Sequence, residues 1–114
     1  METFYIGLGS NLSGSMGDPQ QQIQTALEKI SDHPEIHELN TSSFYRTSPV
    51  GPQDQPEFIN AVAQAKTSLT PLALLDYLQQ IENEHDRERK EHWGARTLDL
   101  DILIFGQQSI HNTR

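Results

Sequence analysis

The chain has 114 residues and a formal net charge of −8 at pH 7. This length suits a single hydrophobic core, so we expect one domain over residues 1–114. Cysteine is absent, which excludes disulfides, thiolate metal sites and cysteine nucleophiles. No apolar run approaches the ~20 residues that span a bilayer and no signal peptide opens the chain, so we expect a cytoplasmic protein without membrane contact. The acidic balance argues against general nucleic-acid binding.

The first half of the chain carries the patterns of a strand, a helix and a strand. Residues 4–9 are a short apolar run that ends in turn residues, which predicts a strand. Asp18, Pro19 and Gln21 form a helix start with capping-box spacing. The apolar residues at helical spacing behind this start are Ile23, Ala26, Leu27 and Ile30. The β-forming residues of 36–47 favour a second strand.

The second half repeats this order after a loop. Residues 48–57 contain three prolines and a glycine without periodicity, which predicts a loop. Residues 58–66 alternate between apolar and polar positions, as a strand does. Thr70 and Pro71 are a second helix start. The apolar residues at helical spacing behind it are Leu74, Leu75, Leu78 and Ile81. Residues 98–105 predict the last strand.

The resulting order, βαββαβ, predicts an α+β fold of the ferredoxin-like class, with an antiparallel sheet and both helices on one of its faces. In the last strand Asp99 and Asp101 share a face, because side chains at i and i+2 point the same way. The residues expected on the opposite face, toward the helices, are Leu98, Leu100, Ile102 and Ile104. The aspartates therefore mark the open face of the sheet.

Two carboxylates that close repel each other unless a cation lies between them. Magnesium is a suitable cation, because a few carboxylates hold it while phosphate oxygens and waters fill its other coordination positions. An ordinary solvated strand face with two exposed aspartates explains the pair equally well when it is considered alone.

Half of the basic residues gather just before this strand: Arg87, Arg89, Lys90 and Arg96. Arginines beside a carboxylate-held metal are typical of phosphoryl transfer. A solvated helix end with alternating charges is the other interpretation, although Trp93 and Gly94 within the cluster favour a shaped site. We expect most of the histidines at the surface, since they lack metal-ligand spacing: His33, His37, His85, His92 and His111.

Three stretches, IGLGSNL, SSFYRTSPVGPQDQPEFINA and RKEHWGARTLDLDIL, together resemble the 6-hydroxymethyl-7,8-dihydropterin pyrophosphokinase family of folate biosynthesis. The resemblance runs through nearly the whole chain, and the W-G-x-R-T-x-D-L-D-I block is its most specific part. It implies a ferredoxin-like enzyme that uses two Mg²⁺ ions to move a diphosphoryl group from ATP to the hydroxymethyl oxygen of a reduced pterin, releasing AMP.

The resemblance also implies roles for individual residues. The metal ligands would be Asp99 and Asp101, and the catalytic arginines Arg87 and Arg96. The residues similar to those that contact ATP are Gln79, Glu82, Arg89, Trp93, Arg96, Ile102 and Arg114. The residues similar to those that contact the pterin are Thr47, Pro49, Val50, Gly51, Phe58 and Asn60.

The chain departs from the family pattern at His92, Asp86 and Ala95, where arginine, glycine and proline are common. Family members also continue beyond residue 114, so we expect an incomplete nucleotide site with weak or no turnover. We also expect the protein to be a monomer. Two other functions stay open. One is a non-catalytic module that binds a small charged ligand on the same fold. The other is single-stranded RNA binding on the open sheet, against which stand the acidity and the two aspartates.

Overall fold

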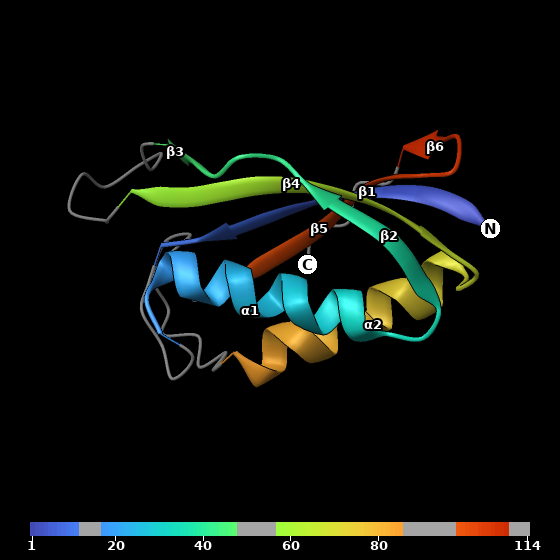
Figure 1. Ribbon diagram of the computed structural model, residues 1–114, viewed down its shortest axis with the longest axis horizontal. Coiled ribbons are helices and arrows are strands. Elements are labelled where there is room, and N and C mark those ends of the chain that lie inside the picture. The colour runs from blue at the N-terminus through green and yellow to red at the C-terminus, as the bar shows by residue number, and fades with distance from the viewer. Residues whose placement is uncertain (12–16, 48–56, 86–97, 110–114) are drawn as a thin grey trace.

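The structure is a computed structural model, and it describes residues 1–11, 17–47, 57–85 and 98–109. Two helices lie side by side beneath a curved sheet (Figure 1). In chain order the elements are β1 (Glu2–Ser10), α1 (Pro19–Asp32), β2 (Ile36–Thr41), β3 (Tyr45–Thr47), β4 (Phe58–Thr67), α2 (Pro71–Glu84), β5 (Asp99–Phe105) and β6 (Gln108–Ser109).

The described strands form one sheet in the order β2-β4-β1-β5-β6, and β3 also pairs with β4. Every pairing is antiparallel. β1 and β2 are separated by β4, and β4 and β5 are separated by β1, so each helix connects two strands that have a third strand between them. This is the split βαβ arrangement, and it confirms the predicted ferredoxin-like fold.

Both helices begin where the sequence predicts. The carboxylate of Asp18 accepts a hydrogen bond from the backbone N–H of Gln21 at 2.9 Å, and the Gln21 side chain accepts one from the Asp18 N–H at 2.9 Å. The Thr70 hydroxyl accepts a bond from the N–H of Ala73 at 3.1 Å. These caps satisfy donors that the first helical turn leaves unpaired.

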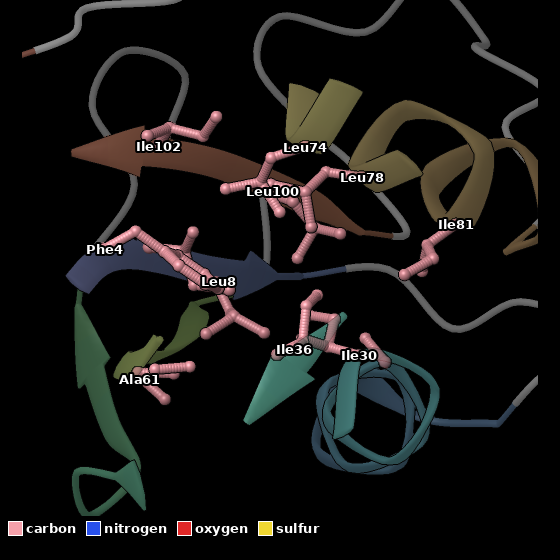
Figure 2. Close-up of a cluster of buried hydrophobic side chains, with 14 of the residues drawn as sticks. Phe4, Leu8, Ile30, Ile36, Ala61, Leu74, Leu78, Ile81, Leu100 and Ile102 are labelled. Carbon is pink, nitrogen blue, oxygen red and sulfur yellow. The ribbon is translucent and has the colours of Figure 1, made fainter. Parts of the chain in front are cut away.

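The hydrophobic core lies between the sheet and the helices. Figure 2 shows Leu74, Leu78 and Leu100 meeting where α2 crosses β5. On the other side of the core, Ile30 of α1 and Ile36 of β2 are also buried. The alternating alanines Ala61, Ala63 and Ala65 of β4 are buried as well. Their small side chains allow α1 to lie close to the sheet.

Two parts of the edges differ from the predicted strands. The single strand expected over residues 36–47 is wrong, because the chain forms β2 and β3 with a break after Thr41. At the break the Ser42 hydroxyl accepts a hydrogen bond from the N–H of Val62 at 2.9 Å. In a continuous strand a backbone carbonyl would accept this bond. The short strand β6 was not predicted, and it follows a turn in which Gly106 has a φ of 62°.

The expectation that Ile104 faces the helices is also wrong. Ile6 pairs with Ile102 while Tyr5 pairs with Ile104, so Leu103 is an extra residue in β5. Such a bulge reverses the side-chain alternation beyond it. Ile104 is 38% exposed as a result, and Phe105, at 6%, takes its place in the core.

Candidate functional site

The two aspartates of β5 lie on the sheet face that the helices leave open. Leu98, Leu100 and Ile102 point into the core, so Asp99 and Asp101 point away from it, and both are half-buried. Directly across the ladder Asp99 pairs with Gly9 and Asp101 pairs with Gly7 of β1. The residues directly opposite the two carboxylates on β1 are therefore both glycines. This confirms that the pair shares the open face.

A second group of predicted residues lies on the same face, two strands away. Thr47 of β3 pairs with Phe58 of β4, and Asn60 pairs with Gly9 as well as with Tyr45. The side-chain amide of Asn60 donates a hydrogen bond to the Thr47 hydroxyl at 2.9 Å. Residues opposite each other in antiparallel strands point the same way, so this group shares its face with the aspartates.

The row from Asp99 through Gly9 to Asn60 crosses three neighbouring strands, β5, β1 and β4. With strands ~4.8 Å apart, the backbones of Asp99 and Asn60 are about 10 Å from each other. The two groups of predicted site residues are therefore separated by a single strand, β1.

The aspartates suit a hard divalent cation. Among the described residues, no three or more His, Cys, Asp or Glu side chains gather as a metal site. Two carboxylates on an open face are nevertheless the donor set that Mg²⁺ uses when substrate phosphates and waters complete its shell. Like charges on one face of a strand repel each other, and a cation between them would relieve that repulsion. The residues present therefore fit Mg²⁺.

Three of the residues predicted to contact ATP are described, two on α2 and one in β5. The carboxylate of Glu82, near the end of α2, accepts a hydrogen bond from the N–H of Leu100 at 2.7 Å. Leu100 lies between the two aspartates, so Glu82 holds β5 at the point where they project. Gln79 lies one helical turn before Glu82 on α2. Ile102 is 1% exposed and belongs to the core, so its predicted contact with ATP stays a prediction.

Several predicted site residues lie outside the described part of the chain. They are Pro49, Val50, Gly51, Arg87, Arg89, Trp93, Arg96 and Arg114. Their assignments stay predictions.

His85 is an exception to the expectation that most histidines lie at the surface, because it is completely buried at the end of α2. Its Nδ1 lies 2.6 Å from Oε1 of Gln22, whose amide nitrogen donates to the Gly17 carbonyl at 3.0 Å. Nδ1 therefore carries the proton of a neutral imidazole, and Nε2 has no partner among the described residues. Burial first, and then the charge of Lys29, lower the pKa of His85 to about 4 against the opposing effect of Glu84.

Helical spacing contains a signal for this burial. His85 continues the buried stripe formed by Leu74, Leu78 and Ile81, and Gln22 precedes the buried Ala26 by four residues. Both polar residues thus extend apolar faces of their helices. A polar residue on such a face is buried only when it finds a partner, and here each supplies the other.

Neither helix in the described ranges has the length and apolar character to cross a membrane.

Comparison with known proteins finds a matching protein family and several similar family members. The family model described as 7,8-dihydro-6-hydroxymethylpterin-pyrophosphokinase matches residues 5–113. A 2-amino-4-hydroxy-6-hydroxymethyldihydropteridine pyrophosphokinase from Haemophilus influenzae is 54% identical over 114 residues, which are all of this chain and 69% of that protein. Proteins of the same name from Pseudomonas aeruginosa and Bacillus subtilis are 49% and 44% identical, over 95% and 93% of this chain. The chain spans 64% and 61% of the length of these two relatives.

Proposed function

Because the chain belongs to the 7,8-dihydro-6-hydroxymethylpterin-pyrophosphokinase family, we propose that it transfers a diphosphoryl group from ATP to the hydroxymethyl oxygen of 6-hydroxymethyl-7,8-dihydropterin. The observation that carries this proposal is the shared open face of the sheet. It brings the predicted metal ligands, Asp99 and Asp101, and the predicted pterin residues Thr47, Phe58 and Asn60 to the same surface.

The pterin end of this surface supplies shape and hydrogen bonds. The ring of Phe58 gives a planar ligand an aromatic surface on which to stack. Asn60 offers an amide whose orientation is set by its bond to Thr47 at 2.9 Å. Heterocycle sites typically combine apolar walls with a small number of such fixed polar groups.

The phosphate end supplies charge. Asp99 and Asp101 would hold two Mg²⁺ ions, which neutralise phosphate charge when bound. Glu82 supports this end by holding the Leu100 N–H between the two aspartates at 2.7 Å. Arg87 and Arg96 would stabilise the charge on the transferred group, for which guanidinium groups are well suited.

In the proposed step, the hydroxymethyl oxygen forms a bond to the β-phosphorus of ATP. The bond between that phosphorus and the oxygen that bridges it to the α-phosphorus breaks, and AMP leaves. The hydroxyl proton passes to solvent or to a phosphate oxygen. No strong general base is needed, because phosphoryl transfer depends mainly on positioning and charge neutralisation. We propose further that the protein acts in the cytoplasm as a monomer.

The test is to incubate the chain with ATP, Mg²⁺ and 6-hydroxymethyl-7,8-dihydropterin and to identify the nucleotide products. We expect AMP, formed only when both Mg²⁺ and the pterin are present. ADP as the product, or AMP formed equally well without the pterin, would refute the proposal. We also expect a slower rate than that of a chain extended to the length of its relatives, and equal rates would contradict this second expectation.

A matched pair of variants locates the chemistry. Asp99→Asn removes one proposed metal ligand at constant shape, and Asp76→Asn makes the same change at an exposed position of α2. We expect Asp99→Asn to abolish AMP formation and Asp76→Asn to leave it unchanged. Parental AMP formation in Asp99→Asn would contradict the proposed metal site on the open face.

A further inference from the structure

Gly9 lies at the centre of the proposed site, between its two functional ends. It pairs with Asp99 on one side and with Asn60 on the other. A Cβ atom added to Gly9 would lie 3.2 Å from Oδ1 of Asn60, which is closer than ordinary van der Waals contact. Its next neighbours, the Ile59 carbonyl oxygen and Cδ1 of Phe58, would be 3.9 and 4.0 Å away. The close approach therefore involves Asn60 alone.

The Asn60 amide is held on its other side and has little freedom to move. Its Nδ2 donates to the Thr47 hydroxyl at 2.9 Å and lies 3.5 Å from the carbonyl oxygen of Phe58. Oδ1 consequently faces the bare backbone of Gly9. A methyl group at position 9 would push Oδ1 away, and the amide could yield only by turning and weakening its bond to Thr47.

Gly7 makes the contrast clear, because it lies on the same strand and the same face. The three atoms nearest to a Cβ atom added there would all belong to the Leu103 side chain, at 3.7 Å or more, which is ordinary contact. Neither glycine has a positive φ among the described backbone angles, so strand geometry does not require glycine at either position. Glycine within a strand lowers the stability of the folded chain. The close approach of Asn60 explains why glycine is favoured at position 9, and no such contact explains the glycine at position 7.

We propose that Gly9 is a positioning residue for pterin recognition, an inference that rests on the function proposed above. Its missing side chain lets the Asn60 amide take the orientation set by Thr47. It also keeps the strip of sheet between Asp99 and Asn60 free of side chains, so that a planar ring can lie against it. Gly9 thus acts through Asn60 and through the space that it leaves.

The test compares Gly9→Ala with Gly7→Ala. The probes are 6-hydroxymethylpterin and a non-hydrolysable ATP analogue with Mg²⁺, and their dissociation constants are measured by calorimetry. We expect Gly9→Ala to raise the Kd of the pterin about tenfold, as the loss of one well-oriented hydrogen bond does. The Kd of the nucleotide should change less than about twofold, and Gly7→Ala should change the pterin Kd by less than about twofold.

Removing Asn60 tests whether Gly9 acts through it. In an Asn60→Ala background, Gly9→Ala should cause a smaller further loss of pterin affinity than in the parent, about threefold or less, because only the effect of the filled space remains. The same background should restore folding if Gly9→Ala alone does not fold, since the remaining contacts are 3.9 Å or longer. In the ligand-free protein, the NMR signals of the Asn60 side-chain amide should shift in Gly9→Ala and stay in place in Gly7→Ala.

Three results would overturn the proposed role of Gly9 without affecting the proposed function. They are parental pterin affinity in Gly9→Ala, an undiminished loss of pterin affinity on adding Gly9→Ala to Asn60→Ala, and a double variant that still does not fold. A parent chain that binds nucleotide but no pterin would overturn the proposed function, and the role of Gly9 with it. The two failures are therefore distinguishable.

Discussion

Gln22 and His85 form a buried hydrogen bond of 2.6 Å between the start of α1 and the end of α2. The two residues are 63 positions apart in the chain, and neither side chain is exposed. Lys29 and Glu84 form a second link between the same helices at 3.1 Å, and the pKa of Glu84 is lowered mainly by this bond. The buried bond holds α2 in place immediately before the segment that carries Arg87.

This bond predicts that stability falls in mild acid. The pKa of His85 is about 4 in the folded chain, against an ordinary value of 6.5. The unfolded chain therefore binds the proton more readily, so the free energy of unfolding should decrease as the pH falls from 6.5 toward 4, by up to about 3 kcal/mol. Urea denaturation at several pH values measures this slope.

Carboxylates also titrate near pH 4, so the contribution of His85 needs a difference measurement. His85→Gln should unfold with a flatter pH dependence than the parent between pH 6.5 and 4. His37→Gln, at an exposed position, should keep the parental slope. Identical slopes for the parent and His85→Gln would show that His85 is not the responsible group.

Asp101→Ala should impair function far more than stability. The variant loses a proposed metal ligand on a half-buried face, while the carboxylate repulsion is relieved. We expect AMP formation to fall by about a hundredfold or more. The free energy of unfolding without Mg²⁺ should stay within about 0.5 kcal/mol of the parent. A thermal melt in which the variant is markedly less stable without Mg²⁺ would count against this role.

Glu82→Ala should loosen β5 between the aspartates. The variant removes the acceptor of the 2.7 Å bond from the Leu100 N–H. Bonds to charged groups contribute about 1.5–3 kcal/mol, so we expect a loss of stability in that range and faster hydrogen exchange at Leu100. Glu82→Gln keeps an acceptor oxygen and should retain most of the exchange protection. Equal exchange rates in Glu82→Ala and the parent would refute this prediction.

Glu38→Asn should stabilise the chain. Glu38 has a φ of 57°, which is unfavourable for most side chains, at the irregularity where β2 pairs with β4. Asparagine tolerates this conformation better, so we expect a gain of about 0.5–1 kcal/mol in urea denaturation. The exposed ion pair between Glu38 and Lys66, 3.4 Å long, is lost as well. Lys66→Gln is the control for that loss, and a less stable Glu38→Asn would contradict the argument.

Local patterns in the sequence determined the helices, most of the strands and the face on which the proposed metal ligands lie. Both helix starts follow from short-range hydrogen bonds at Asp18 and Thr70, which involve residues three positions apart. Asp99 and Asp101 share a face because alternation in a strand needs only the neighbouring residues. The family motifs lie within the same short stretches, so the resemblance and the predicted fold could be recognised together.

The tertiary structure decided what depends on register and on burial between distant segments. The bulge at Leu103, which exposes Ile104, arises from the pairing of β5 with β1 and leaves no local signal in an apolar run. The approach of Gly9 to Asn60 exists only because β1 lies beside β4. His85 is buried only because Gln22, on the other helix, supplies its partner. Strand pairing and helix packing join residues dozens of positions apart, and no periodicity within one segment specifies these contacts.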